Sequence, residues 1–396
     1  METVDFVVVG CGPAGATAAR EAAECGLETV VLEKDAVVGA KRVCAAGLRP
    51  GFCETFDLPR ELVHCDTPRL ALFDARGDEH EVFFGPGHTS TREELDGTMG
   101  RLAMRAGANL RTQTLFRSVV FEDRRAIVEY ADLQGGGRRR IGARSVFLAC
   151  GATARPPAAF EFGAWQSGLM TTLQYRVYLD RPAAAIAYQT LELHYYRATD
   201  GRQIVAWMFP KRDHLAIGLG LTGKMPGREL RAELDEFAGR VGRRLYAGAT
   251  VQFIKEEGHL LYGGYPRRVL ASQGVMIGGT AAGLVDATNG EGIFEAAMSG
   301  RIAAQSVAGE RRDPVRAAAR YAGAVAGRFA RRLSHRVKLM RFLERRPVRY
   351  GVLFEQLANS PRFADVLQRE DWQRSVGDRF YLYLQAMRFA IRAARV

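Results

Sequence analysis

A glycine turn near the N-terminus has the spacing of a phosphate-binding loop. An apolar, β-rich run over residues 4–9 leads into the turn, and a helical pattern follows it. Gly10 permits a tight turn, Gly12 leaves room for a pyrophosphate beside the backbone, and Gly15 lets the helix pack closely on the strand. Unpaired N–H groups at the start of that helix would face phosphate oxygens. The residues of the turn are Gly10, Cys11, Gly12, Pro13, Ala14 and Gly15.

An acidic residue completes this unit. A second strand over residues 28–32 ends at Glu33, 18 positions after Gly15, where its carboxylate can accept hydrogen bonds from the ribose hydroxyls of an adenosine. We include the adjacent Lys34 in the expected cofactor site. Strand, turn, helix and strand therefore predict a dinucleotide site, and its position at the extreme N-terminus favours FAD over NAD.

A second glycine-rich loop covers residues 278–292, between a short strand and a helix expected over residues 293–307. Small residues let a backbone lie against a flat ring or a phosphate chain. The dipole of the helix would point at the pyrimidine end of a flavin and stabilise its reduced, anionic form. An ordinary glycine-rich turn is the alternative interpretation. The expected cofactor contacts here are Gly279, Thr280, Gly290, Gly292 and Ile293.

Composition narrows the classes of protein. The 396 residues are 47% hydrophobic and 25% charged, and 56 Lys and Arg against 44 Asp and Glu leave a formal charge of +12. This excess suits anionic partners, although no nucleic-acid-reading motif accompanies it. The sequence has no apolar run of about 18 residues, no signal peptide and no C-x-x-C pair. We therefore expect no spanning helix, no metal site and a cytoplasmic location.

The pattern of elements predicts an α/β (α+β overall) fold. We expect a Rossmann-like FAD-binding domain made of residues 1–68, 88–160 and 265–310. An inserted antiparallel-sheet substrate domain would comprise residues 69–87 and 161–264, and residues 311–396 would form a helical C-terminal region, with breaks at Pro347 and Pro361.

Four segments resemble the geranylgeranyl reductase family, flavoproteins with the p-hydroxybenzoate hydroxylase type of FAD fold. The first is the N-terminal glycine turn with Glu33. Residues 41–48 resemble the family's cysteine-glycine segment beside the flavin, and residues 92–96 resemble its helix whose arginine reaches the cofactor. The fourth and most specific, residues 206–211 followed by 217–220, resembles the aromatic strand of isoprenoid reductases.

The resemblance implies a reductase that saturates C=C bonds of a polyprenyl chain on a lipid, quinone or chlorophyll-type molecule, with hydride from reduced FAD. It implies cofactor contacts from Arg42, Cys44, Ala45, Arg92 and Gly151. Trp207 and Phe209, two apart on one strand, share a face and could wall the pocket or instead fill the core between sheet and helices. Cys44 would lie near the isoalloxazine, as a proton source or as a packing residue. Trp207, Phe209 and Cys44 are therefore the catalytic candidates.

Several positions depart from the family pattern. Thr280 replaces an aspartate, Ala287 a proline, Cys150 an aspartate and Val205 a tyrosine. FAD binding survives these changes, whereas the electron donor stays open between NAD(P)H and a ferredoxin. The rival functions are a flavin monooxygenase or halogenase, and a flavoprotein assembly factor or electron-transfer partner.

The remaining candidates are histidines, tyrosines and the basic tail. Among the histidines His194 is the hardest to set aside, and Tyr195 and Tyr196 beside it could line the substrate cavity. Residues 328–349 and 379–396 mix apolar side chains with arginines at helical spacing. Such helices can lie on an anionic bilayer, as a peripheral contact on the inner face of the membrane, or can pack on the protein with arginine facing water.

Overall fold

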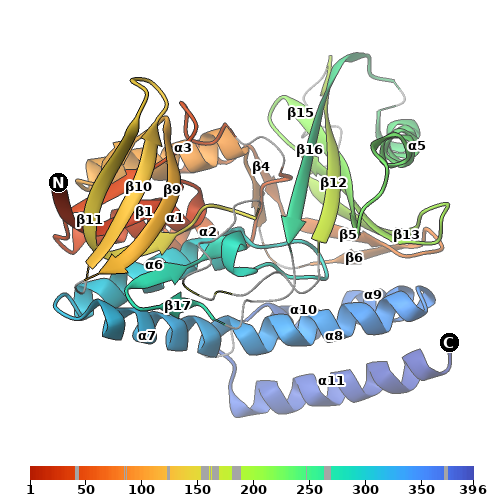
Figure 1. The fold of residues 1–396 in the computed structure, drawn as a ribbon. Coiled ribbons are helices and arrows are strands. Elements are labelled where there is room, and N and C mark those ends of the chain that lie inside the picture. Colours follow the sequence, from red (N-terminus) through yellow and green to blue (C-terminus); the bar gives the residue numbers. More distant parts are fainter. Residues whose placement is uncertain are drawn as a thin grey trace.

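The computed structural model describes residues 1–40, 44–83, 85, 87–122, 125–152, 160, 162, 169–180, 189–246, 248–262, 269–369 and 373–396. Arg42 lies outside these residues. Two large sheets dominate the fold, and a small sheet and a set of C-terminal helices join them (Figure 1). The expected fold class, with a Rossmann-like part, an antiparallel sheet and a helical C-terminal region, is confirmed.

The N-terminal unit lies at the centre of the first sheet, which has eight strands among the described residues. Strands β18, β11, β1, β2 and β8 run parallel, and the β9–β10 hairpin extends β11 antiparallel. Central β1 is apolar and buried from Phe6 to Val9, as expected for a strand covered on both faces. The strands in this sheet are β1 (Glu2–Val9), β2 (Thr29–Leu32), β8 (Asn109–Arg111), β9 (Thr114–Glu122), β10 (Arg125–Asp132), β11 (Arg138–Leu148), β17 (Ala271–Ser272) and β18 (Val275–Ile277).

Helices α1 (Pro13–Glu24), α3 (Arg92–Arg105), α6 (Ile293–Gly309) and α7 (Pro314–Val325) pack beside this sheet (Figure 1). Helices α1 and α6 cross so closely that a Cβ on Gly300 would lie 2.0 Å from the Ala14 carbonyl oxygen. Only glycine allows this crossing. The crossing brings α6, and the glycine-rich loop before it, against the N-terminal turn.

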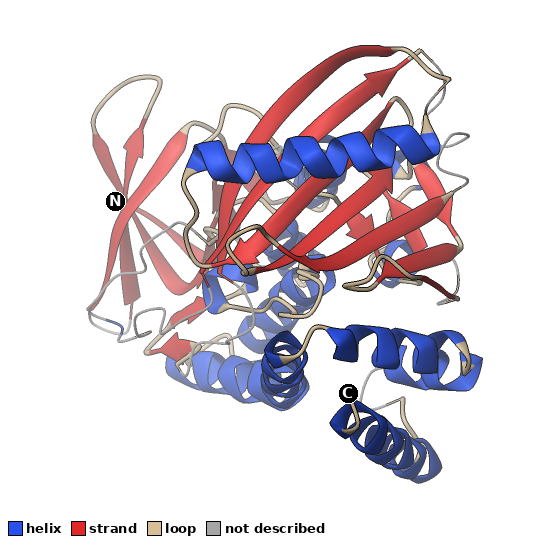
Figure 2. Cartoon of the chain, turned by 90° about the vertical axis from the view of Figure 1, so that its right-hand side faces the viewer, coloured by secondary structure: helices blue, strands red, loops and turns tan. Residues whose placement is uncertain are grey.

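The second sheet is antiparallel except for the parallel β13–β5 pair. Helix α5 (Gly227–Leu245) covers one face with Leu230, Leu234, Phe237 and Val241, which recur at helical spacing (Figure 2). The opposite face is left for the site. In spatial order the strands are β16 (Val251–Tyr262), β12 (Leu169–Leu179), β15 (His214–Thr222), β14 (Gln203–Pro210), β13 (Thr190–Arg197), β5 (Arg69–Phe73) and β6 (Glu79–Val82).

A small sheet connects the two large ones. It contains β3 (Gly47–Leu48), β4 (Cys65–Thr67) and β7 (Gly87–Thr89), and the short helices α2 (Phe52–Thr55) and η1 (Arg60–Leu62) lie between β3 and β4 in the chain. The Thr89 hydroxyl of β7 donates a hydrogen bond to the Pro210 carbonyl at the end of β14, at 2.7 Å. This contact fixes the segment after residue 44 against the second sheet.

The C-terminal helices that follow α7 lie below the second sheet in Figure 1. They are η4 (Ala326–Ala330), α8 (Arg331–Arg345), α9 (Val348–Ala358), α10 (Pro361–Gln368) and α11 (Val376–Ala394). Pro347 and Pro361 precede or begin α9 and α10, as the sequence predicts. Tyr350 and Phe354 of α9 pack with Leu72 and Val82 of the second sheet. None of the helices in the described ranges is both long and apolar enough to cross a membrane.

The α1–α6 crossing predicts the effect of a side chain at position 300. Gly300→Val would force the helices apart, and we expect it to lower the free energy of unfolding by at least about 3 kcal/mol, measured by urea denaturation. Gly323→Ala is the matched control, because among the described atoms none lies within 4 Å of a Cβ at this exposed α7 position. We expect Gly323→Ala to raise the free energy of unfolding by about 0.5–1 kcal/mol. Equal stability of Gly300→Val and the wild type would contradict the crossing.

Candidate cofactor and substrate site

A cavity of about 1070 Å³ extends between the two sheets and the C-terminal helices. Nearly all of the predicted site residues line it, although their roles as ligands remain predictions. Gly15 lies beneath the turn, and Arg42 is outside the described residues. The predicted residues that line the cavity are Gly10, Gly12, Pro13, Ala14, Glu33, Lys34, Cys44, Ala45, Arg92, Gly151, Trp207, Phe209, Gly279, Thr280, Gly290, Gly292 and Ile293.

The first glycine turn has the geometry that the sequence predicts. Gly10 has a φ of +93°, and a Cβ there would lie 2.6 Å from the Ala149 carbonyl oxygen. A Cβ on Gly15 would lie 1.8 Å from the Gly10 carbonyl oxygen. Gly12 is the N-cap of α1, and no side chain of the described residues caps its first turn. The start of α1 is therefore available to an anionic group in the cavity.

Glu33 is held by two backbone donors. Its carboxylate oxygens accept hydrogen bonds from the Cys11 N–H at 2.8 Å and from the Asp35 N–H at 3.0 Å. Each oxygen keeps a second lone pair for another donor. The carboxylate is thus already oriented at the cavity wall, as a contact to ribose hydroxyls requires.

Arg92, at the start of α3, forms a bidentate ion pair with Asp96, with distances of 2.9 and 2.6 Å. The Cys44 thiol is a second partner of its guanidinium. Burial alone would lower the pKa of Arg92, but the opposing effects of Asp96 and Cys44 are together stronger and the net pKa is raised. Arg92 therefore stays charged at the junction of the glycine turn and the Cys44 segment.

The second glycine-rich loop packs directly on the first. Gly279, in the 3-10 turn η3 (Gly279–Ala282), has a φ of +57°, and a Cβ there would lie 3.2 Å from the Ala14 Cβ. Asp286 fixes the rest of the loop by accepting hydrogen bonds from the Thr288 N–H and hydroxyl, at 2.9 and 2.6 Å. The Tyr195 hydroxyl donates to the Thr288 carbonyl at 3.0 Å. Both halves of the predicted cofactor site therefore face one cavity.

The Cys44 segment is held from the side of the second sheet. The Ala46 N–H donates to the Cys44 sulfur at 3.3 Å. The Phe209 ring covers Gly47, where a Cβ would lie 2.6 Å from the ring. Lys211, which is 1% exposed, donates from Nζ to the Ala45 carbonyl. Burial lowers the pKa of Lys211 to about 7.

Trp207 is positioned by a buried polar network that the sequence does not indicate. Its indole Nε1 donates to the Gln174 side-chain oxygen at 3.0 Å, and the ring lies where a Cβ on Gly218 would be 2.4 Å away. Gln174 and Arg176 both contact Glu257, at 3.4 and 3.0 Å, and Arg176 also pairs with Glu93 of α3 at 2.9 Å. The network links the indole to the helix that carries Arg92.

The far end of the cavity is apolar. Side chains from β5, β13, α8, α9 and α10 meet there, and Tyr195 stacks on Tyr350 with ring centroids 4.8 Å apart. The sequence indicates Tyr195. It gives no signal for the lining residues of α8, α9 and α10, because these helices reach the cavity only through the packing of the folded chain. The apolar lining includes Leu72, Leu193, Leu339, Leu343, Leu353, Phe354, Leu357 and Leu367.

Two candidates of the sequence lie elsewhere. Tyr196 points to the other face of the sheet, beside Phe237 of α5 with ring centroids 6.3 Å apart, so its expected place in the cavity is wrong. This follows from the alternation of side chains along a strand. His194 stacks on Phe73 with centroids 4.0 Å apart and contacts Glu192 at 3.0 Å. Its contacts are those of a structural histidine.

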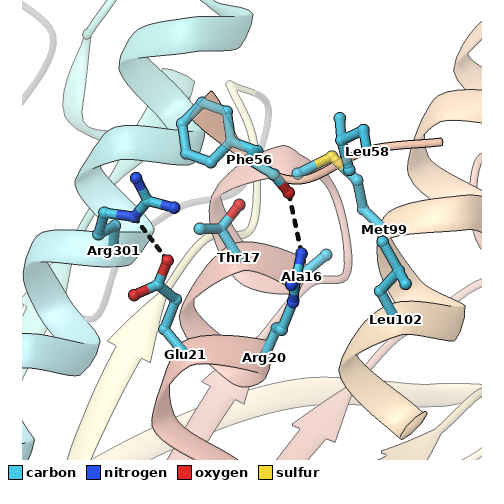
Figure 3. Close-up of a pocket in the computed structure, with 9 residues that line it drawn as sticks. All are labelled: Ala16, Thr17, Arg20, Glu21, Phe56, Leu58, Met99, Leu102 and Arg301. Carbon is cyan, nitrogen blue, oxygen red and sulfur yellow. Dashed lines mark hydrogen bonds and ion pairs between the residues drawn. The ribbon is translucent and has the colours of Figure 1, made fainter. Parts of the chain in front are cut away.

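A separate small pocket lies between α1, α3 and α6 (Figure 3). Its volume is about 10 Å³, and its polar rim is already paired: Arg301 with Glu21 at 2.5 Å, and Arg20 with the Phe56 carbonyl at 2.9 Å. It is too small for a ligand larger than water. Within the described residues, no group of three His, Cys, Asp or Glu side chains could hold a metal ion.

The cavity fits FAD at its polar end. Gly12 and Gly279 provide close backbone approach, Glu33 supplies an oriented carboxylate, and α1 and α6 point their N-termini at the cavity. Helix α6 begins at Ile293 after Gly292, where a Cβ would lie 3.0 Å from the Leu284 carbonyl oxygen.

Comparisons with known proteins place this chain among flavoprotein reductases. A family model described as pyridine nucleotide-disulphide oxidoreductase matches residues 4–176. Digeranylgeranylglycerophospholipid reductase of Methanosphaerula palustris is 30% identical over 331 residues, 76% of this chain and 75% of the relative. Geranylgeranyl diphosphate reductase of Synechocystis sp. is 28% identical over 319 residues, 76% of this chain and 74% of the relative. A geranylgeranyl bacteriochlorophyll reductase-like structure from Thermoplasma acidophilum has a TM-score of 0.70 at 22% identity, with 96% of each chain covered.

The fold and the site define an FAD-dependent oxidoreductase with the p-hydroxybenzoate hydroxylase type of fold. Within this class, the chain belongs to the geranylgeranyl reductase family. The expected cofactor, FAD, and the stated resemblance are thereby confirmed.

The geometry of Glu33 predicts a defined loss of FAD affinity. Glu33→Gln keeps one acceptor oxygen but removes the charge, so we expect about tenfold weaker FAD binding, measured by fluorescence titration of the apoprotein. Glu28→Gln, the same change at an exposed position just before β2, is the control and should bind FAD as the wild type does. Unchanged affinity of Glu33→Gln would argue against the ribose contact.

Buried Lys211 predicts a pH-dependent stability. Its pKa falls from 10.5 in the unfolded chain to about 7 in the folded protein, so between these values the unfolded state binds more protons and stability rises with pH. The cost of burial is complete below pH 7 and disappears as the pH approaches 10.5. Lys211→Met lacks this cost, and its stability relative to the wild type should be highest below pH 7 and fall with increasing pH. Urea denaturation across this range measures the difference, and a constant difference would contradict the prediction.

Proposed function

We propose that this protein saturates C=C bonds of a polyprenyl chain carried by a polar molecule such as a lipid, a quinone or a chlorophyll-type pigment. The observation that carries the proposal is the continuity of one cavity from the FAD-site residues to an apolar end walled by leucine and aromatic side chains. A prenyl chain offers no polar handle, so shape and exclusion of water must position it. The names of the relatives, which act on geranylgeranyl groups, support this substrate class.

Reduction of an isolated alkene needs a hydride at one carbon and a proton at the other. FAD, when bound and reduced, supplies the hydride. Side chains alternate between the two faces of β14. Trp207 and Phe209 lie on the face that lines the cavity, and the residues that alternate with them are buried on the other face. We assign them the positioning of the double bond and the exclusion of water.

Cys44 is our candidate for the proton source. Its sulfur lies beside the Arg92 guanidinium and accepts a hydrogen bond from the Ala46 N–H, so both contacts hold the thiol at the cavity wall. Lys211, bonded to the next carbonyl along the chain, holds this segment in place.

The electron donor and the location complete the proposal. NAD(P)H or a ferredoxin would reduce the FAD. Cys150 stands where related NAD(P)H-dependent hydroxylases have an aspartate, and this difference slightly favours a ferredoxin as the donor. We propose that the protein takes up its substrate as a peripheral protein at the inner face of an anionic membrane, since a polyprenyl lipid resides in the bilayer.

An anaerobic turnover experiment tests this function. The purified flavoprotein, reduced with dithionite, is mixed with a detergent-solubilised geranylgeranyl phospholipid under nitrogen, and flavin absorbance and product mass are followed. We expect flavin reoxidation without oxygen and a product heavier by pairs of hydrogens. Reoxidation only in air, with peroxide or a hydroxylated or halogenated product, would instead establish the rival monooxygenase or halogenase.

Narrowing the apolar end provides the matched variant. Leu339→Trp enlarges a partly exposed lining residue of α8, so geranylgeranyl turnover should fall at least about tenfold, because lost fit of this kind costs about 1–3 kcal/mol. A shorter geranyl substrate should be turned over at close to the wild-type rate. Equal losses for both chain lengths would show that the chain does not occupy this end.

A further inference from the structure

The last helix, α11, is apolar on two opposite faces. Its inner face is buried, with Gln385, Phe389 and Ala393 toward the protein. A helix of a globular protein normally has one apolar face, which packs on the core. On the outer face six large apolar side chains form a second stripe at intervals of three and four residues: Val376 (83% exposed), Phe380 (62%), Tyr383 (61%), Leu384 (43%), Met387 (45%) and Ile391 (54%). We call these six residues the outer stripe.

In the described part of the chain, the inner face and an ion pair between Arg392 and Glu355 of α9 attach α11 to the protein. The Gln356 side chain of α9 donates to the Gln385 carbonyl at 3.0 Å, and Arg349 Nε donates to the Ala393 carbonyl at 3.2 Å. Helices α9 and α10, on which α11 packs, also line the apolar end of the cavity. Figures 1 and 2 show α11 at the outer edge of the molecule, with its length free of other elements on one side. The outer stripe is therefore not required for the packing of the described fold.

The exposed charges of α11 are all positive. Arg379, Arg388 and Arg392 are exposed, and Arg395 follows at the C-cap. By helical geometry, Arg388 and Arg395 border the outer stripe on one side and Arg379 on the other. The one acidic residue, Asp378, is buried in the capping box with Ser375.

We propose that α11 is the membrane-docking element: it lies in the plane of an anionic bilayer with the outer stripe among the acyl chains and with Arg379, Arg388 and Arg395 at the headgroups. Arginine can reach such headgroups from the border of an apolar face. A second copy of this chain fits less well, because pairing two such helices would place arginines against arginines with no exposed carboxylate of α11 between them. Docking through α11 places the helices that wall the cavity next to the lipid that would hold the substrate.

Vesicle flotation of the full-length, FAD-loaded protein tests the proposal. We expect binding to vesicles of phosphatidylcholine with phosphatidylglycerol, and much weaker binding to phosphatidylcholine alone or at high salt. Phe380→Ser combined with Ile391→Ser should reduce binding to the anionic vesicles at least about tenfold, since apolar area drives insertion. The matched control is Phe253→Ser with Ile254→Ser on β16, which removes comparable exposed apolar side chains (55% and 52%) and should leave binding unchanged.

Each outcome is decisive. The proposal is overturned if the α11 variant floats as the wild type does, if the β16 control loses binding equally, or if wild-type protein does not bind anionic vesicles. Light scattering tests the rival occupant, a second copy of this chain. If the wild type is a dimer, the α11 variant is a monomer and neither binds vesicles, the outer stripe is a dimer interface. The α11 variant should retain bound FAD and its rate on detergent-solubilised substrate, which establishes folding. Flotation needs no turnover, so failure of docking and failure of the proposed reductase function are distinguishable.

Discussion

The site depends on one close contact, the crossing of α1 and α6 at Ala14 and Gly300. Because no side chain separates the two helices there, Gly279 at the start of the second glycine-rich loop reaches Ala14 in the first turn. Segments almost 270 residues apart in the chain thus share one cavity wall. A larger residue at position 300 would push against the backbone of Ala14 and so separate the two glycine-rich segments.

The second sheet is joined to this frame by a network of polar contacts. The network from Trp207 through Gln174, Glu257 and Arg176 ends on Glu93 in α3, one residue after Arg92. Because Gln174, Arg176 and Glu257 are buried and contact one another, this network favours one orientation of the sheet over others. The wall that would hold the substrate is in this way oriented by the helix that faces the cofactor.

The C-terminal helices form one wall of the cavity. Arg332 and Arg336 of α8 pair with Glu295 and Asp286, both of which belong to the second glycine-rich loop or the helix after it. Burial raises the pKa of Glu295, although the neighbouring arginines oppose this effect. These ion pairs attach the apolar wall formed by α8 and α9 to the second glycine-rich loop and α6, which explains how a tail of helices comes to line the cavity.

The sequence by itself determined the local features of this protein. Glycine spacing around residues 10–15 and the following acidic residue specify a turn, a helix N-terminus and hence a dinucleotide site, because each depends on a few adjacent residues. The N-terminal position of this motif and the second glycine-rich loop then favoured FAD. The fold class and the family also follow from it, whereas the domain boundaries and the roles of the site residues stay predictions. Only the tertiary structure decided that Tyr195 faces the cavity and Tyr196 does not, that Lys211 supports the Cys44 segment, and that α9 closes the apolar end. Such contacts join residues far apart in the chain, so they depend on how the elements pack, which no local pattern records.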